Sequence, residues 1–263
     1  MSEQCRYFQG AVVIMTGGAS GIGRAMATEM SRRGATLVLA DRQLELAQVV
    51  ATELGNAEAE ELDVRDAAAV EALVRGVFQR HGRLDFMFNN AGIGILGPVR
   101  DTTLEDWQQT VDVNINGVIH GVLAAYAVMR EQGFGHIVNT ASMAGLVASG
   151  NLAAYITSKH AVVGLSKSLA QETREENITV TVLCPGVINT PILEGGKFGR
   201  LISQPPPDAG QDAMDPAEFA RRTIDDIARK KPVIIHPFQW NIILWMSRLC
   251  PPLLSWLMRR RGV

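Results

Sequence analysis

The sequence predicts an α/β fold: a doubly wound parallel sheet of about seven strands with helices on both of its faces. Short apolar runs rich in β-branched residues alternate with longer segments of helical periodicity, as in a parallel sheet with crossover helices. A glycine-rich segment, residues 16–25, joins the first run to the first helical segment. Hydrophobic residues make up 47% of the 263 residues and charged residues 20%, which is usual for a globular protein with a substantial core.

Each strand of the first half is predicted from an aliphatic or β-branched run, and each helix from apolar residues three or four positions apart. We expect strands at 11–18, 35–41, 57–64 and 84–92, the third being more polar than the others. We expect helices at 23–34, 42–55 and 66–82. The first two helices end at Gly34 and Gly55, since glycine commonly terminates a helix, and Asp66 is a suitable cap for the third.

The same alternation continues in the second half of the chain. We expect helices at 104–133, 153–177 and 216–231, and strands at 135–142, 178–186 and 231–237. The segment 104–133 is either one long helix or two helices joined near Gly117. Neither a repeat of fixed period nor a dividing linker is visible, so we expect a single domain over residues 1–263.

Charge and cysteine content argue against several classes of protein. The net charge is −2, from 25 basic and 27 acidic residues, and no basic stripe runs through the body of the chain, so we expect no nucleic-acid partner. The three cysteines are far apart, which argues against disulfides and a metal site and favours a cytoplasmic protein. None of the five histidines has the spacing of a metal ligand or of a nucleophile's partner. Neither a secretory signal nor an uninterrupted apolar run of about 18 residues is visible.

The segment TGGASGIGRA has the properties of a dinucleotide-binding turn. Gly17, Gly21 and Gly23 are spaced so that the backbone can turn sharply and approach a pyrophosphate at the start of the next helix. Asp41 ends the second predicted strand, where a carboxylate accepts hydrogen bonds from ribose hydroxyls and repels a 2′-phosphate, so we expect NAD rather than NADP. Arg42 could meet a 2′-phosphate if it turned inward, but a solvated position at the helix start is the simpler interpretation.

Further motifs follow in order: Asp63-Val64, Asn89-Asn90-Ala91-Gly92, Tyr155 with Lys159, and Cys184-Pro185-Gly186 followed by Thr190. Together with TGGASGIG they make the chain resemble the single-domain branch of the short-chain dehydrogenase/reductase family, from about residue 10 to 195. The resemblance implies a Rossmann-type fold and an NAD(P)-dependent oxidoreductase. It implies that the cofactor is held by Thr16, Gly17, Ser20, Gly21, Ile22, Gly23, Asp41, Arg42, Asp63, Val64, Asn90, Ala91, Gly92, Tyr155, Lys159, Pro185, Gly186, Ile188 and Thr190.

The resemblance assigns catalysis to Asn114, Ser142, Tyr155 and Lys159. Tyr155 and Lys159 are four residues apart and share a helix face. A nearby ammonium, together with the positive nicotinamide of the oxidised cofactor, would lower the pKa of a phenol, which is near 10 in the free side chain. Such a phenol can take a proton from an alcohol or give one to a ketone. Ser142 would hydrogen-bond the substrate oxygen, and Asn114 is implied to hold a water in a proton relay to Lys159.

These observations predict an enzyme that interconverts a secondary alcohol and a ketone, but other interpretations remain open. Each of the four side chains alone is more often a surface or capping residue than a catalytic one. The chain could also be a non-catalytic dinucleotide sensor or scaffold, although a binding module has no physical need for the complete set. A third interpretation is a peripheral membrane enzyme that acts on lipid or steroid alcohols.

The predicted substrate wall is apolar. It comprises residues 93–96, residues 143–147 and Val187, without lysine or arginine, so we expect a neutral hydrophobic alcohol or ketone. Residues 190–215 are rich in glycine and proline and predict a long irregular loop that acts as a mobile lid, with a passive surface loop as the alternative. Lys197 and Arg200 in this loop could meet an anionic substrate.

The tail, residues 238–263, contains three of the four tryptophans and ends in three arginines, 259–261. The proline pair 251–252 and Arg248 are expected to divide it into two short apolar helices. Such a tail suits packing against a second subunit, in a homodimer or homotetramer, or over the active site, and we favour these positions. Contact with a membrane interface is the alternative.

Overall fold

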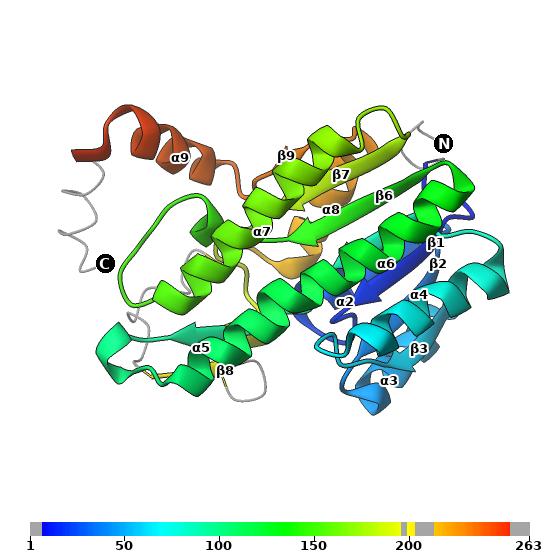
Figure 1. The fold of residues 1–263 in the computed structure, drawn as a ribbon, viewed down its shortest axis with the longest axis horizontal. Helices are drawn as coiled ribbons and strands as arrows, with labels where there is room; N and C mark the ends of the chain where they lie inside the picture. Colours follow the sequence, from blue (N-terminus) through cyan, green and yellow to red (C-terminus); the bar gives the residue numbers. More distant parts are fainter. Residues whose placement is uncertain (1–6, 196–198, 203–212, 253–263) are drawn as a thin grey trace.

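A computed structural model describes residues 7–195, 199–202 and 213–252 of the chain. Seven parallel strands form one sheet in the order β3-β2-β1-β4-β6-β7-β9 (Figure 1). The strands are β1 Val12–Thr16, β2 Thr36–Asp41, β3 Ala57–Glu61, β4 Phe86–Asn89, β6 Gly135–Thr140, β7 Ile178–Leu183 and β9 Val233–Ile234. The chain runs outward from β1 to β3, returns to β4 and runs outward again to β9. The predicted doubly wound parallel sheet is confirmed, with a reversal between β1 and β4 at which such sheets bind ligands.

Helices cover both faces of the sheet (Figure 1). The first face is covered by α2 Gly21–Arg32, α3 Leu44–Leu54 and α8 Pro216–Ala228. The second face is covered by α4 Ala67–His81, α6 Gly117–Gln132 and α7 Ala153–Glu172. Two further helices are α5 Leu104–Val111, before α6, and α9 Gln239–Leu249, after the last strand. Asp66 caps α4 as predicted, because its carboxylate accepts a hydrogen bond from the Ala69 amide at 3.0 Å.

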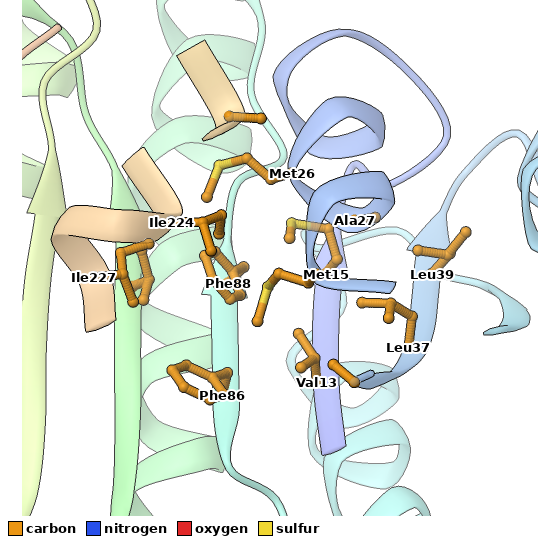
Figure 2. Close-up of a cluster of buried hydrophobic side chains, with 14 of the residues drawn as sticks. Val13, Met15, Met26, Ala27, Leu37, Leu39, Phe86, Phe88, Ile224 and Ile227 are labelled. Atoms are coloured by element: carbon orange, nitrogen blue, oxygen red, sulfur yellow. The ribbon is translucent and has the colours of Figure 1, made fainter. Parts of the chain in front are cut away.

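Successive side chains along a strand point to opposite faces of the sheet, so each face has its own hydrophobic core. Val13 and Met15 of β1 pack with Met26 of α2 on the first face (Figure 2). Val12 and Ile14 of the same strand belong to the core on the second face. The central strands are buried on both sides, which is why they are continuous apolar runs in the sequence.

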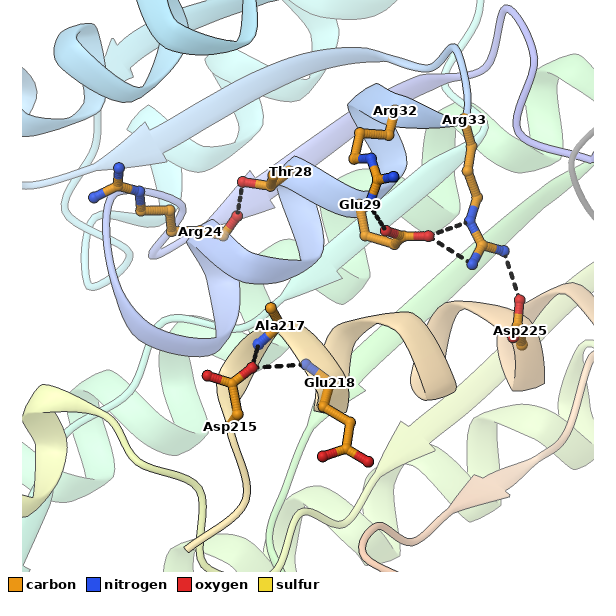
Figure 3. Close-up of polar contacts among 9 residues, drawn as sticks. All are labelled: Arg24, Thr28, Glu29, Arg32, Arg33, Asp215, Ala217, Glu218 and Asp225. Carbon is orange, nitrogen blue, oxygen red and sulfur yellow. Dashed lines mark hydrogen bonds and ion pairs between the residues drawn. The ribbon is translucent and has the colours of Figure 1, made fainter.

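Ion pairs join α2 to α8 on the first face. Arg33, directly after α2, lies 2.7 Å from a carboxylate oxygen of Glu29 and 2.8 Å from one of Asp225 in α8 (Figure 3). Asp215 caps α8 by accepting hydrogen bonds from two backbone amides of its first turn, at 2.9 and 3.0 Å. These contacts hold α8 against α2, whose N-terminus borders the candidate cofactor site.

The predicted order of these helices and strands is confirmed, with shifts at several ends. α7 ends at Glu172, α8 ends at Ala228 and β9 contains only two residues. The predicted helix 104–133 is one continuous helical segment in which Asp112–Asn116 form a π-helical turn directly before Gly117. Helix ends depend on tertiary contacts, and the local pattern specifies them poorly.

The described part of the predicted irregular loop at 190–215 contains two short regular pieces. Pro191–Leu193 form a 3-10 turn, and Gly199–Leu201 form strand β8, which pairs in parallel with β5 Gly94–Leu96. Strands this short have too few residues for a periodic signal, and their pairing partners are distant in sequence. Residues 196–198 and 203–212, which include Lys197, lie outside the described residues, and the lid stays a prediction.

The tail begins with a single helix. α9 continues through Arg248, so this residue does not divide the tail, but the helix ends at Leu249 and residues 251–252 are helical again after Cys250. The rest of the predicted second helix lies outside the described residues. Among the described residues, one helical segment, Leu104–Gln132, could cross a membrane by length and composition, but half of its apolar window is buried in the fold, as in a core helix. The extent of a single domain over residues 1–263 stays a prediction.

Candidate active site

The glycine-rich turn between β1 and α2 is packed so closely that two of its glycines leave no room for a side chain. Gly17 has a φ of +65°, and a Cβ atom on it would lie 3.0 Å from the Cα atom of Ala91. A Cβ atom on Gly23 would lie 2.1 Å from the Gly17 carbonyl oxygen, so α2 approaches the turn only without one. Ser20 is the N-cap of α2, yet its hydroxyl makes no capping hydrogen bond. This hydroxyl and the first amides of α2 can therefore bind a pyrophosphate, and the turn fits the predicted dinucleotide.

Thr16 and Asn90 hold this turn against the end of β4. The Thr16 hydroxyl donates to the Phe88 carbonyl oxygen at 3.1 Å and accepts from the amides of Asn90 and Ala91 at 2.9 and 3.1 Å. The Asn90 side-chain amide donates to the Thr16 carbonyl oxygen at 3.0 Å. The structure thus gives both residues a positioning role at the point where the strand order reverses.

Asp41 lies at the end of β2 beside the same turn. Its Oδ2 accepts a hydrogen bond from the Ala19 amide at 3.1 Å, and its Oδ1 accepts one from the Gln43 amide at 3.0 Å. The carboxylate therefore stabilises the turn, and each oxygen keeps a second lone pair that a ribose hydroxyl could use. Arg42 is exposed, and its Nε lies 3.9 Å from Oδ2 of Asp63.

Tyr155 and Lys159 lie in the first two turns of α7, next to the carboxyl end of β6. The Lys159 side chain is buried, and its ammonium donates to the Thr140 carbonyl oxygen at 2.9 Å. The ammonium nitrogen lies 5.6 Å from the centre of the Tyr155 ring. Ser142, just beyond β6, hydrogen-bonds to the Tyr155 side chain and accepts from the Ala144 amide at 3.1 Å. The fold thus brings three of the predicted catalytic side chains together.

Burial changes the protonation of this pair. It lowers the pKa of the Lys159 ammonium from 10.5 to about 8, with a small opposing effect of Cys184. It raises the pKa of the Tyr155 phenol above its ordinary value, and the hydrogen bond with Ser142 offsets part of that rise. For the protein side chains alone, without the positive nicotinamide, the prediction that Lys159 lowers the pKa of Tyr155 is therefore wrong. The physical reason is that burial penalises a phenolate, while the ammonium is bonded to the Thr140 carbonyl.

Asn114 is fully buried in the π-helical turn that connects α5 to α6. Its Oδ1 accepts from the Ile93 amide, and its Nδ2 donates to the Ile93 carbonyl oxygen, both at 2.9 Å. A Cβ atom on Gly92 would lie 3.3 Å from Asn114 Oδ1 and 3.4 Å from Lys159 Nζ. The amide and the ammonium therefore face the same small space beside Gly92, at a type of turn that is frequent at functional sites.

Ser158 is a site residue that the sequence reasoning missed. Its hydroxyl accepts from the Asn114 side-chain amide at 3.1 Å and donates to the Tyr155 carbonyl oxygen at 2.7 Å. It thereby connects the π-helical turn to α7 behind the Tyr155–Lys159 pair. The sequence shows only a serine before Lys159, and a serine inside a helix commonly bonds to a preceding carbonyl without further meaning.

The other predicted cofactor residues border the turn or pack beneath it. A Cβ atom on Gly21 would lie 3.4 Å from the Thr190 side chain. Gly186, after Pro185, lies against the indole of Trp240, whose Nε1 would be 2.0 Å from a Cβ atom on that glycine. Four of the set are apolar and pack in or against the hydrophobic cores: Ile22, Val64, Ala91 and Ile188.

The residues of the predicted substrate wall do not all lie together. Ile95 is buried in β5, whereas Leu146 lines a groove beside α9. Arg200 of β8 is engaged by the protein itself, because its Nη1 lies 3.1 Å from Oδ2 of Asp106 and its Nη2 donates to the Asp101 carbonyl oxygen at 3.1 Å. This pairing argues against Arg200 as a partner for an anionic substrate.

Within the described residues, neither a metal site nor the cleft between α2 and α8 adds a catalytic group to this site. Within residues 7–195, 199–202 and 213–252, no three His, Cys, Asp or Glu side chains are placed to hold a metal ion. A cleft of about 510 Å³ between α2 and α8 is bordered by Gly21, Asn189 and Asp215, but by none of the four predicted catalytic residues.

Comparisons with known proteins agree with this geometry. The family model described as short chain dehydrogenase matches residues 11–197. The chain is 40% identical over 195 residues to levodione reductase of Leifsonia aquatica, covering 71% of this chain and 73% of that protein. It is 35% identical over 204 residues to cyclohexanol dehydrogenase of Acinetobacter sp. (strain SE19), covering 76% and 81%. A crystal structure of a short chain dehydrogenase/reductase from Burkholderia phymatum in complex with NAD has a TM-score of 0.84 and 30% identity, over 95% of this chain and 96% of that chain.

A longer relative matches almost the whole chain, including most of the tail. The protein named probable oxidoreductase EphD of Mycobacterium tuberculosis is 40% identical over 272 residues, which cover 98% of this chain and 46% of that protein. The chain thus spans about half the length of this relative.

Proposed function

The chain belongs to the short chain dehydrogenase family, and on that basis we propose that it is an NAD-dependent oxidoreductase that interconverts a secondary alcohol and a ketone. The observation that carries the proposal is the convergence of Ser142, Tyr155 and Lys159 at the carboxyl end of β6. Relatives named levodione reductase and cyclohexanol dehydrogenase support this substrate class.

Tyr155 is the proposed general acid and base. Its raised pKa keeps the phenol protonated at neutral pH, so in the reductive direction it donates a proton to the ketone oxygen as charge develops there. The Ser142 hydroxyl, which already bonds to the phenol, stabilises the same oxygen. In the oxidative direction the phenol must lose its proton, a step that burial of the ring opposes, and the Lys159 ammonium lies 5.6 Å from the centre of the ring.

The protein groups around the glycine-rich turn would hold the cofactor. When bound, a nicotinamide dinucleotide supplies or accepts the hydride. Ser20 and the first amides of α2 would bind its pyrophosphate, and Asp41 would bind the adenosine ribose, which favours NAD. A family member solved in complex with NAD supports this choice. Initial rates with both cofactors test it: we expect the higher kcat/KM with NAD, and a preference for NADP would contradict the role of Asp41.

We propose a neutral, hydrophobic small molecule as substrate, because Ile95 and its neighbours are apolar and Arg200 is paired with Asp106. The proposal further includes a single domain, a cytoplasmic location and a homodimer or homotetramer without nucleic acid. Light scattering of the purified protein measures the oligomeric mass.

Replacement of Tyr155 by phenylalanine tests the central role. We expect Tyr155→Phe to lower kcat on a panel of secondary alcohols by about 10²-fold or more, because the proton donor and acceptor is removed. NAD binding, measured by fluorescence, should remain. The matched control is Tyr126→Phe. Tyr126 lies on α6, and its hydroxyl donates a hydrogen bond to a carboxylate oxygen of Glu176 at 2.7 Å. Wild-type activity in Tyr155→Phe contradicts the assignment, and NAD binding without turnover of any alcohol or ketone favours the sensor interpretation.

A further inference from the structure

One face of α9 presents large apolar side chains to solvent. The exposed fractions are 71% for Phe238, 55% for Ile242, 62% for Trp245 and 71% for Leu249. Spacings of four, three and four residues place these side chains on a single helix face. None of the residues of α9 is buried, and the helix lies apart from those that cover the sheet (Figure 1).

The opposite face of α9 rests on the body of the protein. Trp240 and Leu244 pack against the core on the second face of the sheet. The Trp240 indole also lies against Gly186. The helix is therefore held in place by its inner face, while its apolar outer face has no partner within the described residues.

The charges around α9 are basic. Arg248 is the only charged residue between Gln239 and Leu249. A groove of about 300 Å³ beside the helix is lined by apolar side chains together with Lys167, Asn241 and Arg248, and by no acidic residue. In the sequence no aspartate or glutamate follows Asp226, and the last charged residues are the three arginines 259–261.

We propose that this face docks on the surface of an anionic lipid bilayer. The α9 face, defined as Phe238, Ile242, Trp245 and Leu249, would enter the headgroup region, where tryptophan and phenylalanine are favoured. Arg248 and Lys167 at its edge would pair with anionic headgroups.

A second copy of the chain is a poorer match for the α9 face. In a symmetric contact the same surface meets itself. Arg248 and Lys167 would then lie close to their own copies, without an acidic side chain in the groove or in α9 to offset the repulsion. A negatively charged lipid surface has the complementary charge, and it accepts an apolar helix face without a matching pocket.

Vesicle binding by the full chain tests the proposal, with no substrate or cofactor present. The probe is vesicles of equal parts phosphatidylglycerol and phosphatidylcholine, with binding measured by co-sedimentation and tryptophan fluorescence. We expect the triple variant Phe238→Ser, Trp245→Ser, Leu249→Ser to bind about tenfold more weakly or worse. Arg248→Glu should weaken binding to these vesicles by about tenfold and leave binding to pure phosphatidylcholine unchanged.

The matched control changes three apolar side chains elsewhere that are also more than half exposed: Val49→Ser, Leu104→Ser and Leu123→Ser, whose exposed fractions are 52%, 78% and 62%. We expect it to bind vesicles as the wild type does. Wild-type protein that stays unbound, or a triple variant that binds like wild type, overturns the proposal. A wild type that stays unbound while the triple variant loses oligomeric mass overturns it in favour of a second copy. Oxidation of soluble alcohols is assayed separately, so a failure here leaves the proposed function untouched.

Discussion

At the scale of single residues, the candidate site depends on a cation that the fold has removed from water. Lys159 is 3% exposed, and burial lowers its pKa from 10.5 to about 8. This shift corresponds to about 3 kcal/mol by which the folded state disfavours the ammonium at neutral pH. The bond to the Thr140 carbonyl offsets part of that penalty. A buried charge that weakens the fold is typical of a residue retained for function.

We therefore predict that Lys159→Met is inactive but at least as stable as wild type at pH 7, by about 1–2 kcal/mol after the lost hydrogen bond is subtracted. Since the folded pKa lies below the unfolded one, the unfolded state binds more protons between pH 8 and pH 10.5. Wild-type stability from this group thus rises with pH through that window. The difference in unfolding free energy between the variant and wild type should be largest at pH 7 and smaller at pH 10. Calorimetry measures this difference. A variant less stable than wild type at pH 7 contradicts this account of Lys159.

At the scale of elements, close approach of backbones positions the site. A Cβ atom on Gly145 would lie 2.5 Å from the Lys159 carbonyl oxygen, so the turn after Ser142 packs directly on α7. A Cβ atom on Gly23 would meet the Gly17 carbonyl oxygen at 2.1 Å. Both neighbours are backbone atoms, which cannot move aside without displacing the element they belong to.

Two glycine substitutions test this reasoning. We expect Gly23→Ala to destabilise the protein by about 2–4 kcal/mol and to abolish NAD binding, because the added methyl separates α2 from the turn. Gly164→Ala on α7 is the matched control: a Cβ atom there has nothing within 4 Å, and alanine should stabilise the helix by about 1 kcal/mol. Urea unfolding and titration calorimetry with NAD measure both effects. Unchanged NAD affinity in Gly23→Ala would mean that the cofactor does not bind at this turn.

At the scale of the whole molecule, the central strands are joined by buried polar side chains as well as by their backbones. Asn89 of β4 donates to Asn139 of β6 at 2.8 Å, and Asn139 donates to Ser166 of α7 at 2.9 Å. His136 of β6 lies 2.8 Å from the Thr181 hydroxyl of β7, and burial lowers its pKa from 6.5 to about 3. Neutral polar groups that hydrogen-bond to one another can be buried at little cost, but a buried histidine lowers the stability of the fold in acid because it resists protonation.

We predict a loss of stability in mild acid that depends on His136. The folded pKa is depressed, so the contribution of the neutral imidazole is complete above pH 6.5 and is lost as the pH falls toward 3. The expected slope is about 1.4 kcal/mol per pH unit below pH 6.5. His136→Gln, which does not titrate, should flatten the decline between pH 6.5 and 5, whereas His160→Gln at an exposed position should not. Urea unfolding across that range measures the slopes, and identical slopes in all three proteins refute the assignment.

The sequence by itself predicted the doubly wound sheet and the glycine-rich turn, and its family resemblance pointed to Ser142, Tyr155 and Lys159 as the catalytic set. Alternation along a strand, helical spacing and motif spacing are local properties, so residues such as Val12–Thr16 and Gly17–Gly23 indicate them without the fold. The β5–β8 pair, the hydrogen bond between Ser158 and Asn114, and the outward face of α9 were decided by the tertiary structure alone. The tertiary structure also decided that the pKa of Tyr155 is raised, because burial and contacts between distant residues arise only when the chain is packed.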